Sequence, residues 1–354
     1  MSVINYVVYR SNPYHSLLYA AMPESHAALP GGVDEAIDAL ATQPGQILHI
    51  NWEEHALRYC ATAAEAAIAC EHMLGQLRRF TAAGGRCFWT VHNIEAHEQQ
   101  FTELQMRLRQ GIADVAERIV IHTLQTVEVL QRQIRLPQEK LFYLPHPSYL
   151  GHYEPEEQTR TAALAPRASR QLLVFGQMRR YKGLHGLLEA LPEGFLEEQA
   201  LTLRLVGQAR PGDEYLDSLR QATEQRRRVR LEPRRVSNAR VAPLFHASLA
   251  LVLPHERFLN SGVALLGLSL GLPSIAPATE AMRELWPVVA HRLLYRPGEA
   301  ADLRRAVGEV AGLGLAEREE IVRALLARAQ HLHPARISRE LLALFETAPP
   351  ARAG

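Results

Sequence analysis

Apolar residues follow two periods along this chain. Short runs rich in β-branched and aromatic residues recur, and each is followed by a longer stretch in which apolar residues return at helical spacing. Strands that alternate with helices in this way are typical of βαβ units around parallel sheets. The pattern predicts five strands in the first half, at 3–9, 46–51, 86–92, 118–123 and 141–144, and five in the second, at 171–175, 201–206, 229–231, 249–253 and 273–276.

A polar, proline-containing stretch separates the two sets of strands. Residues 154–170 read EPEEQTRTAALAPRASR and offer little to bury, which is typical of a linker. We therefore expect two doubly wound, Rossmann-like α/β domains that face each other across a cleft. The N-terminal domain is expected at 1–155, the linker at 156–170, the C-terminal domain at 171–330 and a helical tail at 331–354, with packing against the N-terminal domain as one option for the tail. Ligands bind such sheets at the carboxyl ends of the strands, where the strand order reverses.

Composition excludes several classes of protein. The 39 basic and 38 acidic side chains give a net charge of +1, so no overall field attracts nucleic acid. A hydrophobic fraction of 47% argues against disorder, and no apolar run reaches the roughly 18 residues of a membrane-spanning helix. The start, MSVINYVVYR, lacks the basic and then apolar order of a signal peptide. Cys60, Cys70 and Cys87 form no CxxC motif and are expected to be buried in a cytoplasmic protein.

Lysine is rare in this sequence, which makes each occurrence informative. Of the 39 basic residues, 37 are Arg and only Lys140 and Lys182 are Lys. Lys182 lies in VFGQMRRYKGLHGLLEAL (174–191), between a predicted strand end and a predicted helix. Gly176 allows a tight exit from the strand, Gly183 opens the helix, and Arg179 and Lys182 supply charges that suit a diphosphate. A solvated basic loop is the alternative interpretation.

A second helix start that suits an anion is predicted in HERFLNSGVALLGLSLGLPSIAP (255–277). Asn260 or Ser261 can cap this helix, and Gly262 lets a ligand approach its first amides, where the helix dipole is positive. An ordinary capped core helix is the alternative. Two such helix starts in neighbouring units of one sheet predict a site for a nucleoside diphosphate.

One set of residues resembles the donor domain of GT-B glycosyltransferases: Gly176, Arg179, Tyr181, Lys182 and Gly183, followed by Asn260, Ser261 and Gly262. The first half agrees in the segments SNPYHSLLYAAM (11–22), LHINWEEHALR (48–58) and WTVHNIEAHE (89–98). The pattern is most similar to bacterial exopolysaccharide enzymes of glycosyltransferase families 4 and 94, and among them to the β-mannosyltransferases of the xanthan pathway. The resemblance extends from about residue 11 to residue 277.

This resemblance implies a hexosyltransferase that moves a sugar from a nucleotide sugar to a saccharide acceptor in bacterial polysaccharide synthesis. Mannose from GDP-mannose is the donor in the most similar enzymes, and a polyprenyl-diphosphate-linked saccharide is one form of the acceptor. UDP-sugars stay open as donors because they are common in the wider group. The implied donor-site roles are leaving-group neutralisation by Arg179 and Lys182, contacts to phosphate or sugar from Gly176, Asn260, Ser261 and Gly262, and a frame for the nucleobase near Arg235 and Val236.

The helix that follows residue 262 departs from the retaining members of this family. Typical family 4 enzymes carry two glutamates eight residues apart around this helix, whereas Leu266 stands at the second position and Glu256 does not restore the spacing. We therefore expect inversion, as in the similar β-mannosyltransferases. No D-x-D sequence occurs, so we expect no metal and no other cofactor, with the departing diphosphate stabilised by Arg179 and Lys182.

An inverting transfer needs a general base for the acceptor hydroxyl, and the first half offers two candidates. Glu54 lies in Trp52-Glu53-Glu54 after the second predicted strand, and Glu98 follows the third. A carboxylate in a partly closed cleft can have its pKa raised enough to accept a proton. Either residue could equally supply a charge to the start of the next helix, so the choice stays open.

Further residues of the first half are expected to face the cleft. His92 leaves the third predicted strand directly, and the resemblance implies that it contacts the donor sugar or its phosphate. Asn93 is expected to orient that loop. Asn12, Tyr14 and Trp52 complete the expected acceptor or donor contacts, although Tyr14 is equally well explained as a capping aromatic.

Contact with a membrane surface is a weaker expectation. It rests on a predicted basic amphipathic edge, in which arginines lie beside apolar residues. These residues are Arg78, Arg79, Arg107 and Arg109, beside Leu77, Phe80, Met106 and Leu108. Ordinary solvated helix faces are the alternative interpretation.

Three rival functions fit less well than a transferase. A non-catalytic nucleotide-sugar-binding protein on a decayed GT-B fold need not retain the loop from Arg179 to Lys182. A sugar-nucleotide epimerase predicts carboxylates that flank the cleft from both halves. An NAD-dependent oxidoreductase lacks the G-x-G-x-x-G that should follow the first strand.

Overall fold

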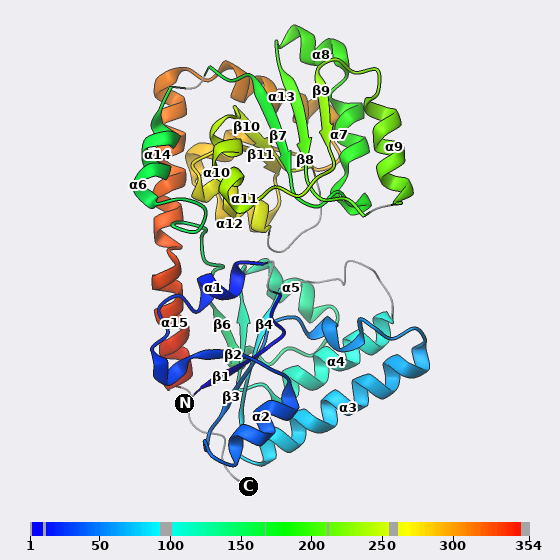
Figure 1. The fold of residues 1–354 in the computed structure, drawn as a ribbon, viewed down its shortest axis with the longest axis vertical. Helices are drawn as coiled ribbons and strands as arrows, with labels where there is room; N and C mark the ends of the chain where they lie inside the picture. The colour runs from blue at the N-terminus through cyan, green and yellow to red at the C-terminus, as the bar shows by residue number, and fades with distance from the viewer. Residues whose placement is uncertain are drawn as a thin grey trace. The chain divides into compact units, whose positions relative to one another are not determined.

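The computed structural model describes residues 2–9, 12–92, 101–166, 168–210, 212–254 and 261–347. The chain forms two compact units (Figure 1). Unit 1 comprises Met1–Pro147 and Pro334–Gly354, and unit 2 comprises Ser148–His333. Each unit is built around a parallel sheet of six strands, as expected for two doubly wound α/β domains.

The sheet of unit 1 has the strand order β2-β1-β3-β4-β5-β6. Its strands are β1 (Val3–Tyr6), β2 (Ala28–Pro30), β3 (Ile47–Ile50), β4 (Arg86–Val91), β5 (Arg118–Ile121) and β6 (Leu141–Tyr143). Its helices are α1 (Tyr14–Leu18), α2 (Val33–Leu40), α3 (Ala63–Ala82), α4 (Thr102–Val115), α5 (Gln125–Gln131) and α15 (Pro334–Thr347), with a short 3₁₀ helix at Glu53–Leu57.

Two apolar clusters fill the two faces of this sheet. Because side chains alternate along a strand, Cys87 and Trp89 of β4 join the cluster under α3 and α4, whereas Phe88 joins the cluster under α1 and α15. Leu341 and Phe345 of α15 are fully buried in the second cluster, and each such side chain contributes roughly 1.5–3 kcal/mol. Helix α15 therefore covers this face of the unit 1 sheet together with α1.

The sheet of unit 2 has the strand order β12-β11-β10-β7-β8-β9. Its strands are β7 (Gln171–Phe175), β8 (Thr202–Val206), β9 (Val229–Glu232), β10 (Ala250–Val252), β11 (Ser274–Pro277) and β12 (Leu294–Tyr295). Its helices are α6 (Glu156–Leu164), α7 (Leu184–Ala190), α8 (Glu193–Glu198), α9 (Glu214–Thr223), α10 (Asn238–His246), α11 (Gly262–Ser269), α12 (Glu280–Leu285), α13 (Ala300–Gly312) and α14 (Leu315–His331).

Both sheets reverse their strand order once. In unit 1 the chain runs outward from β1 to β2 and then crosses to β3 on the other side of β1. In unit 2 it runs from β7 through β8 to β9 and then crosses to β10, which pairs with the free side of β7. The loops that leave β1 and β3, and those that leave β7 and β10, therefore border the two crevices where ligands bind in such sheets.

The structure differs from the sequence expectations at the edges and at the domain boundary. All ten expected strands form, and two short edge strands, β2 and β12, are added. Residues expected to be linker instead form α6, which packs against α14 and buries Ala163. The first unit ends at Pro147 rather than at residue 155, and α15 lies in unit 1.

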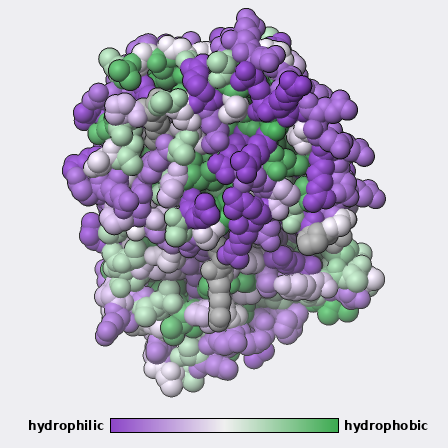
Figure 2. All heavy atoms as spheres, turned by 45° about the horizontal axis from the view of Figure 1, so that its top comes forward, coloured by the Kyte–Doolittle hydropathy of each residue, from purple (hydrophilic) through white to green (hydrophobic). Residues whose placement is uncertain are grey.

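The expected basic amphipathic edge does not form as predicted, because most of its apolar half is buried, and contact with a membrane surface stays a prediction. Leu77, Phe80 and Leu108 are core residues of unit 1, and Arg109 is buried in an ion pair with Glu53. Among the described residues, none of the helices combines the length and apolar character needed to cross a bilayer. Hydrophilic side chains cover much of the face drawn in Figure 2, with apolar residues in patches between them.

The cysteines are all free thiols. Cys70 and Cys87 are buried, as expected, whereas Cys60 is only partly buried. Burial raises the pKa of the Cys87 thiol to about 12, so this residue acts as a small apolar side chain rather than as a nucleophile.

Candidate functional site

The loop that leaves β7 lies against the loop that leaves β10. Gly176 has a φ of +114°, and a Cβ at this position would stand 3.3 Å from Val263 in the first turn of α11. Gly183 has a φ of +67°, and a Cβ there would stand 3.1 Å from the carbonyl oxygen of Pro254. Both positions need a backbone conformation that favours glycine. The glycines thus let the segment 176–183 pack close to β10 and α11.

A small pocket opens at this crevice, and Lys182 lines it. The lining comes from β7, β8, β10, the loops that follow β7 and β10, and α11, with Gly176, Met178, Lys182, Pro254 and Val263 at its wall. Its cavity volume of ≈ 20 Å³ is about that of one or two ordered waters. A nucleotide would therefore lie over its mouth, with only a small group inserted.

Lys182 is the cation of this crevice. Its side chain is half-buried, and its ammonium lies 5.0 Å from the ring centroid of Tyr181. Within the described part of the chain no carboxylate forms an ion pair with it. Burial lowers the pKa of Lys182 to about 8, because desolvation disfavours the charged form. An unpaired cation in such a place is stabilised when an anionic ligand binds beside it.

Two arginines flank Lys182 in different ways. Arg179 Nη1 lies 3.9 Å from Asp213 Oδ2, at the outer limit of an ion pair. Arg180 stacks its guanidinium over the ring of Tyr215, 5.4 Å from the centroid. Arg179 is therefore weakly tethered and can turn to a ligand at low cost, whereas Arg180 is held against α9.

The start of α11 supplies the second half of the crevice. Ser261 caps the helix, because its Oγ accepts a hydrogen bond from the Ala264 amide at 3.2 Å. A Cβ at Gly262 would stand 2.8 Å from the hydroxyl oxygen of Tyr149, so the first turn tolerates no larger residue without a shift. Leu266 is buried in the core of unit 2 and has no polar group to offer a ligand.

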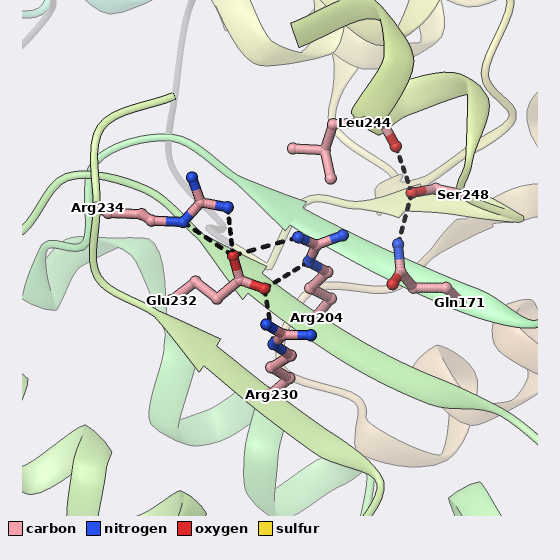
Figure 3. A network of polar contacts seen from close by, with 7 residues as sticks. All are labelled: Gln171, Arg204, Arg230, Glu232, Arg234, Leu244 and Ser248. Atoms are coloured by element: carbon pink, nitrogen blue, oxygen red, sulfur yellow. Dashed lines mark hydrogen bonds and ion pairs between the residues drawn. The ribbon is translucent and has the colours of Figure 1, made fainter. Parts of the chain in front are cut away.

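The loop after β9, expected to frame a nucleobase, lies beside a dense polar cluster (Figure 3). Glu232 Oε1 accepts from Arg204 Nε at 2.8 Å and pairs with Arg230 Nε at 2.9 Å, while Oε2 accepts from Arg234 Nη2 at 2.8 Å. Burial would raise the pKa of Glu232, but the hydrogen bonds from Arg204 and Arg234 and the charges of Arg204 and Arg230 outweigh it and lower the pKa. The cluster carries a net positive charge at the end of this edge strand.

Arg235 and Val236 follow directly after this cluster, with Arg235 exposed and Val236 half-buried. Because β8 separates β9 from β7, this loop does not line the pocket around Lys182. The structure thus brings together Gly176, Lys182 and the start of α11, and it leaves Arg235 and Val236 at a distance of two strands.

Unit 1 has a buried polar network at its own crevice. Asn51 Nδ2 donates to Asn5 Oδ1 at 2.8 Å, and Asn51 Oδ1 accepts from His92 Nε2 at 3.3 Å. His49 Nε2 is hydrogen-bonded with Thr90 Oγ1 at 2.7 Å. All five side chains are buried, and they come from the carboxyl-terminal parts of β1, β3 and β4. Paired groups of this kind rigidify a site.

Tyr14 is a central member of this region rather than a surface cap. His122 Nδ1 donates to the Leu144 carbonyl at 2.7 Å, so His122 Nε2 accepts from the Tyr14 hydroxyl at 3.1 Å. The Tyr14 ring contacts His92 edge to face, with centroids 4.5 Å apart, and lies 4.9 Å from the ring of His146. Burial raises the pKa of Tyr14.

The histidines of this region are uncharged near neutral pH, because burial disfavours the imidazolium form. Burial lowers the pKa of His92 well below its usual value, and the charges of His122 and His146 lower it further. The same cause lowers the pKa of the others to about 3 or 4; these are His15, His49, His122 and His146. His92 can thus meet a ligand only as a neutral imidazole.

Trp52 and His92 lie together. Their rings stack with centroids 4.6 Å apart and an interplanar angle of 17°. Glu54 is half-buried in the first turn of the 3₁₀ helix Glu53–Leu57. Burial raises the pKa of Tyr6, and the charges of Tyr9 and Glu54 raise it further.

Glu53, directly before the candidate base, has a different environment. Its Oε1 accepts from Arg109 Nε at 2.7 Å and its Oε2 from Trp89 Nε1 at 3.2 Å. Both charged side chains are nearly inaccessible, at 3% for Glu53 and 1% for Arg109. This pair fixes the 3₁₀ helix to α4 and β4, so that Glu54 and Trp52 keep their orientation.

The remaining expected residues fall into two groups. Asn12 is exposed, and its Oδ1 accepts from the Tyr14 amide at 3.1 Å, so it orients the start of α1. Asn93, Glu98 and Asn260 lie outside the described residues.

Sequence reasoning missed His15 and His146. His15 is buried, and neither ring nitrogen has a hydrogen-bond partner in the described structure; its ring contacts Trp52 with centroids 4.9 Å apart. His15 lies in the segment SNPYHSLLYAAM (11–22) but gave no signal of its own, and His146 lies outside the segments that carried the resemblance. The fold brings them to Trp52 and Tyr14.

Comparisons with known proteins agree with this architecture. Residues 169–312 match the family model described as "Glycosyl transferases group 1". The chain is 26% identical over 272 residues to a GDP-mannose:glycolipid 4-beta-D-mannosyltransferase of Xanthomonas campestris pv. campestris, covering 76% of this chain and 71% of the relative.

Solved structures share the fold of the whole chain. HepE of Anabaena in complex with UDP superposes with a TM-score of 0.72 at 14% identity and covers 98% of this chain and 100% of that one. A sucrose-phosphate synthase from Thermosynechococcus elongatus has a TM-score of 0.67 at 18% identity, with 96% and 79% covered.

Proposed function

Since the chain is a glycosyltransferase with the GT-B fold, we propose that it moves mannose from GDP-mannose to a saccharide acceptor carried on a lipid, in bacterial polysaccharide synthesis. The named activity of the Xanthomonas relative supports both the donor and the lipid-linked acceptor.

Lys182 is the observation that carries the donor site. It is a half-buried ammonium without an ion-pair partner in the described chain, and it lies where strand order reverses, beside the start of α11. A diphosphate placed over this pocket would meet Lys182, the weakly held Arg179 and the first amides of α11. These groups would stabilise the negative charge that develops on the leaving nucleoside diphosphate. No metal is proposed for this role, because the cations of the chain can take it.

The acceptor side is proposed to lie in unit 1. Glu54 is the general base that takes the proton from the acceptor hydroxyl; it lies half-buried in the 3₁₀ helix that follows β3, at the crevice of unit 1. His92, neutral and stacked on Trp52, orients a sugar hydroxyl by hydrogen bonding. Direct attack of the deprotonated hydroxyl on the sugar C1, with departure of the diphosphate on the opposite side, inverts the anomeric carbon. Buried Leu266, at the position of a ribose-binding glutamate in retaining relatives, supports this stereochemistry.

Thermal-shift and calorimetric binding to a panel of nucleotide sugars tests the donor assignment. The panel contains GDP-mannose, GDP-fucose, UDP-glucose, UDP-glucuronate and UDP-galactose at matched concentration. We expect GDP-mannose to raise Tm most and to bind at least tenfold more tightly than each UDP-sugar. A preference for a UDP-sugar would replace the donor, and binding of none would overturn the transferase assignment of this pocket.

A further inference from the structure

An aromatic shelf lies beside the proposed base and has no role in the donor site. It consists of Tyr9, His55, Arg58 and Tyr59, which come from the loop after β1 and from the segment that includes the 3₁₀ helix after β3. These two loops border the crevice of unit 1. Tyr9 also contacts Trp52 edge to face, with centroids 5.0 Å apart, which connects the shelf to the ring that stacks on His92.

The members of the shelf hold one another in place. Arg58 Nη1 donates to the Tyr9 hydroxyl at 3.1 Å, and this hydroxyl donates to His55 Nδ1 at 3.3 Å. The Arg58 guanidinium lies 5.7 Å from the ring centroid of Tyr9 and 5.8 Å from that of Tyr59. The rings of His55 and Tyr59 meet at 89° with centroids 5.5 Å apart. Each side chain of the shelf thus has a fixed neighbour.

One ring of the shelf, that of Tyr59, is unusually exposed to solvent. Tyr59 is 79% exposed although it is a large aromatic residue, while Tyr9 and His55 are partly buried. A side chain this exposed buries little apolar area and stabilises the fold only weakly. Isolated exposed aromatics need no explanation, but here the exposed ring is one of three that are organised around a single arginine.

The charges around the shelf suit a neutral, hydroxyl-rich ligand. Burial lowers the pKa of His55 and the charge of Arg58 lowers it further, so His55 is a neutral ring. The Arg58 guanidinium lies over the rings of Tyr9 and Tyr59, and Glu54 directly precedes His55 in the 3₁₀ helix. A pyranose ring has an apolar face of C–H bonds and a rim of hydroxyls, and it therefore stacks on an aromatic ring while its rim hydrogen-bonds to charged neighbours.

We propose that the shelf formed by Tyr9, His55, Arg58 and Tyr59 binds the second sugar ring of the saccharide acceptor, next to the ring that receives the new linkage. This inference rests on the proposed function, in which Glu54 accepts the proton of the acceptor hydroxyl. The ring that reacts lies over Trp52 and His92, and the next ring along the acceptor stacks on Tyr59. An acceptor with two sugar rings is therefore preferred to one with a single ring.

Binding of alkyl glycosides to the full chain tests this subsite. Octyl glycosides of glucose, mannose and galactose, each in one-ring and two-ring forms, are titrated and followed by saturation-transfer NMR. At least one two-ring glycoside is expected to bind wild type more tightly than its one-ring form. Tyr59→Ala is expected to weaken that binding about fivefold to tenfold, the loss of one aromatic stacking contact. Tyr143→Ala, which removes another exposed tyrosine of unit 1, is the matched control and should bind as wild type does.

The outcomes separate this subsite from the proposed function. Binding of GDP and UDP, measured in parallel, should be the same in wild type and in Tyr59→Ala. Absence of nucleotide binding in wild type would overturn the donor site of the proposed function, whereas the glycoside titration decides the shelf. Equal glycoside affinity in wild type and Tyr59→Ala, or no binding of any glycoside to wild type, overturns the shelf. Loss of binding to anionic phospholipid vesicles in Tyr59→Ala, without any glycoside binding, would show that the shelf meets a lipid surface and would overturn it as well.

Discussion

The two sheets reverse their strand order in the same way, but the side chains at the two reversals differ in charge and in how they are paired. In unit 1 the crevice is lined by a network of neutral groups that hold one another, with Asn51, His92 and Tyr14 at its centre. In unit 2 the crevice has glycine turns, one cation without an ion-pair partner in the described chain, and an arginine held at 3.9 Å from its carboxylate. Topology alone therefore does not decide what a crevice binds.

The difference matches the two kinds of ligand that a sugar transfer needs. A neutral sugar is recognised by hydrogen bonds and ring stacking, which require rigid, pre-oriented groups. A diphosphate is recognised by charge, and a loosely held Arg179 can turn to it without breaking a strong native ion pair. Under the proposed function, the unit 1 crevice would take the sugar acceptor and the unit 2 crevice the diphosphate. The following experiments test that assignment.

The largest expected difference is in acid stability. The buried histidines of unit 1 have folded-state pKa values below the usual value, with His49 and His146 at about 3 and His15 and His122 at about 4. Below about pH 6.5 the unfolded chain binds these protons and the folded unit does not, so stability falls as pH falls towards 4, by up to about 1.4 kcal/mol per pH unit for each histidine.

Hydrogen exchange at pH 7, 5.5 and 4.5 measures this loss unit by unit. We expect amides of β3, β4 and β5 to lose protection first, while those of β7, β8 and β10 stay protected. Equal loss in both units, or full protection of unit 1 at pH 4.5, would contradict neutral buried histidines.

Two adjacent glutamates should separate chemistry from stability. Glu54→Gln removes the proposed base and should lower kcat by roughly 10²–10⁴, with Tm unchanged. Glu53→Gln leaves the Arg109 charge buried without its counterion and should cost about 3–5 kcal/mol of stability. Urea unfolding and initial rates of transfer measure the two effects. A wild-type kcat in Glu54→Gln would show that another group is the base. Normal stability of Glu53→Gln would show that the ion pair between Glu53 and Arg109 does not stabilise the fold.

How much of this was predictable from sequence differs between the two crevices. The strands of both sheets follow from apolar periodicity except for two edge strands. β2 has no buried residue and β12 has only two residues, so neither gives a pattern. The turns at Gly176 and Gly183 and the position of Lys182 between them were also predictable, because they depend on local backbone geometry; that this loop binds the donor stays a prediction. The neutrality of His92 was not, because it depends on burial beside His122 and His146, which are distant in sequence.

Helical periodicity also does not say which face is buried in the tertiary structure. Arg109 therefore looked like part of a basic surface edge, whereas it is buried against Glu53. In the same way, the polar segment at 156–170 looked like a linker, but Ala163 and Thr159 give α6 a narrow buried side.

The central claim is that Lys182 binds the diphosphate of the donor, and binding of GDP to Lys182 variants tests it most directly. Because the chain has only two lysines, Lys140 supplies the control variant. Lys182→Met is expected to weaken GDP binding about 100-fold. Lys140→Met should bind normally, because the Lys140 ammonium donates to the carbonyls of Ala113 and Asp114. With a pKa of about 8 in the free protein, Lys182 loses its charge as pH rises, so wild type should bind GDP more weakly at pH 9.5 than at pH 7, by about tenfold. Lys182→Arg keeps its charge and should bind almost equally at both pH values. Calorimetry that gives equal GDP affinity for wild type and Lys182→Met would contradict the account.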